Sequence, residues 1–320
     1  MARYLSQRLL KGILTVFVSV TLTFFILRLI PSDPVSLMID PKMGPEVKAA
    51  MMAQMGLDKP IGQQYLIFLG NLLKGNMGIS FASRLPVTTV IMQKLPWTLL
   101  LMAIVILFSV LIGIPIGVWA ARKQGQALDR FVGTASMLGI SIFIPFLSFA
   151  LLFVFSYVLK ILPTGGAYTP PPAQGFAYVL DVARHAALPA LTLFINEVAS
   201  IILYTRSSML EVLKEDYMRT ARSKGWGEGY VIWAHGLRNA MIPTATVTGL
   251  MVISMMGGAV MTETVYAWPG IGRLIYDSVS ALDYPVLQGA FLILSLTVVV
   301  IGILTDLIVA WLDPRIKLGS

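Results

Sequence analysis

The 320 residues include 24 Lys and Arg and 16 Asp and Glu, so only 12% are charged, whereas soluble domains carry about 25%. Hydrophobic types make up 57%, the mean hydropathy is +0.79 and cysteine is absent. This composition excludes a soluble domain, a disordered chain and a disulfide-stabilised secreted scaffold. It indicates a polytopic membrane protein. In such a protein the net charge of +8 is first interpreted as a signal of membrane orientation, and it does not by itself imply nucleic-acid binding.

Six apolar segments, each long enough to cross a bilayer as a helix, follow one another along the chain. They cover about 9–30, 97–121, 131–159, 186–205, 239–262 and 284–312. The third is uncharged over its whole length and contains Pro145. Such continuous runs exclude a β-barrel, whose strands alternate over ~10 residues. The sequence therefore predicts an all-α protein with six transmembrane helices in one domain over residues 1–320.

Lys and Arg set the expected orientation. With the N-terminus in the cytoplasm, the cytoplasmic segments hold 14 Lys and Arg in 61 residues, and the external segments hold 9 in 113. The positive-inside rule favours this arrangement, with both termini cytoplasmic.

A long external segment, 31–96, contains a predicted helix. Apolar residues recur at helical spacing between Pro60 and Gly75, namely Ile61, Tyr65, Phe68, Leu69, Leu72 and Leu73. Two interpretations stay open: the helix lies against the chain's own external helix ends, or it contacts a delivered ligand or a binding protein.

A second long segment, 206–238, lies on the cytoplasmic side. Leu210, Leu213, Tyr217, Ala221 and Lys224 share a helical spacing. Glycines at 225, 227 and 229 then predict a turn, and a second short helix is expected over 230–240. The segment is either a solvated basic face or a docking element, and its turn geometry favours docking.

The chain lacks the common catalytic motifs. It has no Gly-Lys dipeptide and therefore no phosphate-binding loop for nucleotide hydrolysis. Its two histidines, His185 and His235, are predicted on opposite sides of the membrane, so neither a metal site nor an intramembrane enzyme is expected.

Polar groups inside the apolar segments are pathway or interface candidates, because ionisable groups are costly in a bilayer. Asn196 and Glu197 lie in the fourth segment, and Asp306 lies in the sixth. Glu197 has three open interpretations: it faces a wet cavity between helices, contacts a neighbouring subunit, or carries protons in a secondary carrier.

The cytoplasmic motifs resemble a known family. EDYMRTARSKG at 215–225, with HGLRNAMIP at 235–243, is similar to the "EAA" loop of binding-protein-dependent ABC importer permeases, in the first-permease type of the dipeptide/oligopeptide/nickel branch. Further matching motifs are RY at 3–4, IPSDP at 30–34, GLDKP at 56–60, ETVYAWPGIGR at 263–273, DYPV at 283–286 and DPRI at 313–316. Arg219 and Thr220 replace the Glu and Ala of the generic loop.

The resemblance implies a type I ABC importer permease (MetI-like) fold in the bacterial inner membrane, without a cofactor. It implies a second homologous permease, two cytoplasmic ATPase subunits, a periplasmic or lipid-anchored solute-binding protein and membrane lipid as partners, and no nucleic acid. The expected solute is a di- or oligopeptide. Nickel or a metal–chelator complex, glutathione and oligosaccharides are alternatives, and a proton-coupled carrier using Glu197 is an alternative of another class.

The resemblance also implies a coupling helix at 215–226 that docks on an ATPase subunit. Its candidate residues are Glu215, Asp216, Tyr217, Arg219, Thr220, Ala221, Arg222, Lys224 and Gly225. We expect Tyr217, Arg219, Ala221 and Arg222 to face the ATPase, with the small Ala221 allowing close approach. Gly225 is expected to end the helix in the left-handed conformation.

Overall fold

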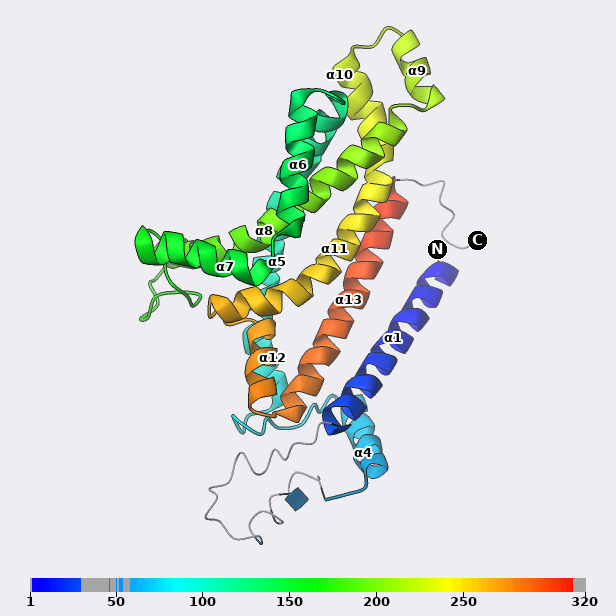
Figure 1. The fold of residues 1–320 in the computed structure, drawn as a ribbon. Helices are drawn as coiled ribbons and strands as arrows, with labels where there is room; N and C mark the ends of the chain where they lie inside the picture. Colours follow the sequence, from blue (N-terminus) through cyan, green and yellow to red (C-terminus); the bar gives the residue numbers. More distant parts are fainter. Residues whose placement is uncertain (1, 30–45, 47–49, 51, 54–57, 313–320) are drawn as a thin grey trace. The chain divides into compact units, whose positions relative to one another are not determined.

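The computed structural model describes residues 2–29, 46, 50, 52–53 and 58–312, and the named elements in these stretches are all helices (Figure 1). The long helices are α1 (Ala2–Leu29), α5 (Val87–Arg122), α8 (Phe176–Val212), α11 (Leu237–Val265) and α13 (Tyr284–Leu312). The shorter ones are α4 (Ile61–Leu73), α6 (Ala127–Ser141), α7 (Ile144–Leu152), α9 (Asp216–Ser223), α10 (Glu228–Tyr230) and α12 (Ile271–Ser280), with π-helical segments η1 (Phe153–Val158) and η2 (Val231–Gly236). The all-α prediction is confirmed, while the motifs at 30–34 and 313–316 lie outside the described residues.

Within the described residues, five helices are long and apolar enough to cross a membrane, and a broken pair raises this to six. The stretch predicted as the third span, 131–159, is broken in the structure, because the chain bends by 95° between α6 and the helical stretch Ile144–Val158. Ile142 and Phe143 adopt extended backbone there. Pro145 stands in the first turn of α7, where its missing N–H costs no helical hydrogen bond.

The first of two compact units contains residues 97–269, with α1 up to Arg8 and α13 from Val300. Helix α8 is its centre and packs against α6, α7 and α11 (Figure 1). Glycines bring α5 against α8, since a Cβ on Gly113 would lie 2.8 Å from Ile201 Cγ2. A Cβ on Gly117 would lie 2.7 Å from Thr205 Cβ. Small residues give such close approach in membranes, where packing drives association.

The second unit consists of the described parts of 9–96 and 270–299. Apolar side chains from the start of α5, from α12 and from the start of α13 form its core. Asp283, in the motif 283–286, is buried and accepts hydrogen bonds from the Ser80 hydroxyl (2.5 Å) and from the backbone N–H groups of Phe81 (3.0 Å) and Ala82 (3.1 Å). This motif residue therefore holds a loop in place.

Helix α4 confirms the helix predicted from the spacing of 61–73. It follows Pro60, and Gly75 with φ +75° lies just beyond its end. Its Tyr65 hydroxyl lies 2.7 Å from the Thr21 hydroxyl of α1, and Phe68 stacks on Phe24 with ring centroids 5.3 Å apart. The helix thus lies against α1, as the first of the two interpretations expected.

Candidate functional site

The predicted cytoplasmic segment folds as a helix, a turn and a second helix, but the boundaries differ from those expected. The spacing over 210–224 covers two helices, because α8 ends at Val212 and α9 begins at Asp216 after Glu215 in extended backbone. The second helix is not a separate short one: α10, η2 and α11 follow one another from Glu228 without a break. Helices α9 and α10 lie together at one end of α8 and α11 (Figure 1).

Helix α9 is attached to the rest of its unit by a small apolar core. Met218 and Ala221 point inward and pack with Val231 of η2, and Val212 and Leu213 at the end of α8 cover them. The prediction that Ala221 faces a partner is therefore wrong, since it is only 6% exposed within this chain. The spacing of apolar residues predicted that a helix forms here. Which face of α9 is buried depends on η2, whose position the sequence does not reveal.

The outer face of α9 is polar and exposed. Asp216 and Arg219 form an ion pair of 3.5 Å in which the Arg219 side chain is 82% exposed. Tyr217 is exposed beside them, as are Glu215, Thr220 and Lys224. This face is free for a partner in the described part of the chain.

The turn after α9 is held by a glycine and an ion pair. Gly225 has φ +80°, the left-handed conformation that was expected, and a Cβ there would meet nothing within 4 Å. Arg222 bridges the turn by pairing with Glu228 at 3.1 Å, so the structure uses it within the loop. Behind the turn, Trp226 stacks on His235 with centroids 4.8 Å apart, an arrangement that the sequence did not suggest.

The polar residues inside the spans do not form one cluster of mutual contacts. The Asn196 amide donates to the carbonyl of Ile140 (3.2 Å), just before the break between α6 and α7. Glu197 is half-buried on α8, and no hydrogen bond or ion pair to another described residue engages its carboxylate. Asp306 instead pairs with Arg8 at 2.7 Å.

A buried ion pair was missed. Asp129, at the start of α6, is 4% exposed and accepts from Arg206 Nε (2.5 Å) and Nη2 (2.9 Å) on α8, and also from the N–H of Gly125. The sequence placed Asp129 in a basic connecting segment, where Arg122, Lys123 and Arg130 dominated the interpretation. The one sequence feature that could have indicated the pair is that Asp129 is the only acidic residue in this basic segment.

A second missed network surrounds the motif at 263–273. The Tyr266 hydroxyl donates to the carbonyl of Ser148 (2.9 Å) and lies 3.0 Å from the Thr192 hydroxyl, so it ties α7 to α8. Glu263 accepts from the buried Thr98 hydroxyl at 2.7 Å. These motif residues therefore organise the unit's interior.

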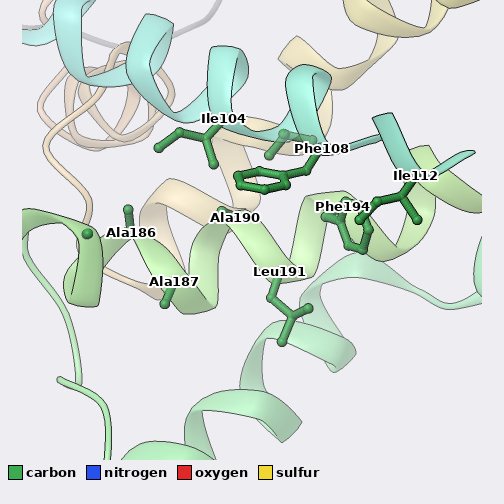
Figure 2. Close-up of a pocket in the computed structure, with 10 residues that line it drawn as sticks. Ile104, Phe108, Ile112, Ala186, Ala187, Ala190, Leu191 and Phe194 are labelled. Atoms are coloured by element: carbon green, nitrogen blue, oxygen red, sulfur yellow. The ribbon is translucent and has the colours of Figure 1, made fainter. Parts of the chain in front are cut away.

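The described residues offer no metal site, and the groove between α5 and α8 is apolar. No three His, Cys, Asp or Glu side chains among them converge to hold a metal ion. A groove of about 430 Å³ between α5 and α8 is lined by apolar side chains, including Phe108, Ala186, Ala190 and Phe194 (Figure 2). This groove contains no charged or hydrogen-bonding side chain with which to bind a peptide.

Comparisons with known proteins agree with this architecture. The family model of the binding-protein-dependent transport system inner membrane component matches residues 113–318, and that of the N-terminal membrane component matches residues 1–102. The chain is 39% identical to a di/tripeptide transport system permease, DppB, of Pseudomonas aeruginosa, over 99% of both chains. It is 38% identical to an oligopeptide permease, AppB, of Bacillus subtilis, over 99% of this chain and 100% of the relative.

A solved structure shares the fold. The MetNI methionine ABC transporter in an inward-facing conformation matches with a TM-score of 0.58 and 18% identity. The match covers 71% of this chain and 97% of that one. The MetI-like fold expected from the resemblance is thereby confirmed.

Proposed function

Because the chain belongs to the binding-protein-dependent transport system inner membrane component family, we propose that it forms half of the pathway through which an ATP-driven importer moves di- or oligopeptides. The observation that carries the proposal is full-length similarity to relatives named as di/tripeptide and oligopeptide permeases. The other half of the pathway belongs to a second, homologous permease. A solute-binding protein delivers the peptide on the external side, and the two units of this chain act as one permease domain.

The energy for transport enters through the cytoplasmic loop. The sequence contains no phosphate-binding loop, so ATP is hydrolysed by two separate ATPase subunits. Helix α9 is the element that we propose for docking on one of them, through its exposed face with Tyr217 and Arg219. This assignment places the loop and both termini in the cytoplasm, in agreement with the excess of Lys and Arg there.

The packing of α9 supports a mechanical role. Because Met218 and Ala221 are buried against η2 and the end of α8, a displacement of α9 moves these elements with it. Helix α8 holds α6 at two points, Arg206 to Asp129 at one end and Asn196 to Ile140 at the other. We propose that α8 and α6 move together, and that α7 follows them because Tyr266 bonds the Ser148 carbonyl of α7 and contacts Thr192 of α8.

The half-buried Glu197 lies on α8, four residues before Ile201. Ile201 packs on α5. We propose that its carboxylate faces the pathway or the second permease, because contact with hydrocarbon would cost about 2.5–3.5 kcal/mol. Asn196 has its own partner at the helix break, and Asp306 pairs with Arg8, so both have structural roles in this proposal.

A matched pair of glycine variants tests the coupling helix. Gly225→Val places a β-branched residue at φ +80°, at a cost of about 1–2 kcal/mol that misdirects the loop. Gly229→Val makes the same change in α10, where φ is not positive and a Cβ also meets nothing within 4 Å. In the assembled complex, we expect only Gly225→Val to lower peptide uptake and the stimulation of ATP hydrolysis by loaded binding protein.

Equal behaviour of the two glycine variants would contradict the role of this loop. Substrate class is tested separately with the purified cognate binding protein, by mass spectrometry of the ligand that it retains. A retained di- or oligopeptide supports the proposal. Nickel or a metal chelate, glutathione or an oligosaccharide would assign the same machinery to another solute.

A further inference from the structure

Helix α4 has an apolar face that the described residues of the chain do not cover. None of its residues from Ile61 to Leu73 is charged. Tyr65 and Phe68 face α1, whereas Leu66 is 69% exposed and Leu73 is 90% exposed. A helix in an aqueous loop would hold these leucines in water, which is unfavourable by about 1.5–3 kcal/mol for each fully exposed side chain relative to an apolar environment.

The contacts of α4 place it beside the membrane-spanning part of α1. Its Tyr65 hydroxyl reaches Thr21, and its Gln64 amide oxygen accepts from Arg28 Nε at 2.8 Å. Thr21 lies eight residues before the end of α1 at Leu29, which is about 12 Å along a helix. Helix α1 is long and apolar enough to cross a membrane, so α4 packs beside the last two turns of a spanning helix.

The surroundings of α4 favour lipid as its neighbour. Leu22 and Ile26 of α1 are exposed like the leucines of α4, so the apolar surface continues from the span onto the short helix. A groove of about 410 Å³ between α1, α4 and α13 is lined entirely by apolar side chains and glycine, among them Val20, Leu72 and Leu296. The shape and chemistry of this groove suit an acyl chain.

Charges at the two ends of α4 complete the pattern. Lys59 precedes the helix with Asp58 beside it, Lys74 follows the helix, and all three are exposed. Helices that lie in a membrane interface combine an apolar face with lysines that reach the lipid phosphates. We propose that α4 is an interfacial helix, with Leu66 and Leu73 among the acyl chains and the two lysines at anionic headgroups, in the leaflet where α1 ends.

Site-directed spin labelling tests this proposal directly. The chain contains no cysteine, so a single introduced cysteine carries the only label on this chain, and the chain is labelled before it is assembled with its partner subunits. Leu66→Cys and Leu73→Cys are compared with Phe17→Cys, an exposed position on the span α1, and with Gln174→Cys, an exposed position between helices. The complex is reconstituted in vesicles of phosphatidylethanolamine and phosphatidylglycerol, without binding protein.

The readout is collision of each label with oxygen, which concentrates in lipid, and with a water-soluble nickel chelate. We expect oxygen to dominate at positions 66 and 73, as at 17, and the nickel chelate to dominate at 174. Dominance of the chelate at 66 and 73 would overturn the proposal, because α4 would then lie in water. Protection from both reagents would also overturn it, because a protein surface would then cover the helix.

Discussion

Removing either partner of the Asp129–Arg206 pair is expected to destabilise the chain, and Arg206→Met more than Asp129→Asn. The pair joins α6 to α8 through two hydrogen bonds, of 2.5 and 2.9 Å. Losing one partner of a buried ion pair costs about 3–5 kcal/mol, because the other charge stays buried alone. The two single variants leave different charges behind, so the structure predicts different costs.

In Arg206→Met the residue left without its cation is Asp129, whose side chain is only 5% exposed. We expect a loss near the lower end of that range, about 3–4 kcal/mol, because the N–H of Gly125 still donates to the carboxylate. In Asp129→Asn the residue left is Arg206, whose side chain is 27% exposed, and the amide oxygen still accepts one of its hydrogen bonds. The expected loss is then smaller, about 1–3 kcal/mol.

Chemical unfolding of the purified complex in detergent, followed by tryptophan fluorescence, measures these differences. The double variant Asp129→Leu with Arg206→Met replaces both charges by apolar groups and is expected to recover most of the stability, because no buried charge stays unpaired. A double-variant cycle in which the two losses simply add, within about 0.5 kcal/mol, would refute the reasoning.

Three further replacements and one control variant test individual residues. Tyr266→Phe deprives the Ser148 carbonyl of its donor and is expected to lower the free energy of unfolding by about 1–3 kcal/mol, measured by the same unfolding assay. Glu197→Leu is expected to reduce uptake more than the amount of assembled complex in membranes; equal loss of both would indicate a structural role. Gly139→Val, where a Cβ would lie 2.9 Å from Ala199, is expected to cost about 1–3 kcal/mol. Gly133→Val, in open space on the same helix, should leave assembly unchanged.

Elements with a periodic pattern and clear ends were predictable from the sequence. Helix α4 is an example, because apolar residues recur every three to four positions and Pro60 and Gly75 punctuate the run. The left-handed Gly225 was likewise predictable, since glycine commonly follows a helix C-terminus in this conformation. Local chemistry decides both features.

Features that depend on a neighbouring helix were not predictable. The break after Ser141 lies in an uncharged run, and Asn196 of α8, far along the chain, supplies the hydrogen bond at the exposed carbonyl. The inward face of α9 is set by its packing on Val231, and this packing buries Ala221. The face of α4 that packs on α1 also depends on a neighbouring helix, because its contacts are with Thr21 and Phe24.

ATP-driven uptake in proteoliposomes tests the central claim most directly. The chain is reconstituted with its second permease, with the ATPase subunits on the inside and the binding protein with a radiolabelled dipeptide on the outside. We predict uptake that requires ATP and this chain and that persists when an uncoupler collapses the proton gradient. Uptake without ATP that the uncoupler abolishes would contradict the account and favour a proton-coupled carrier.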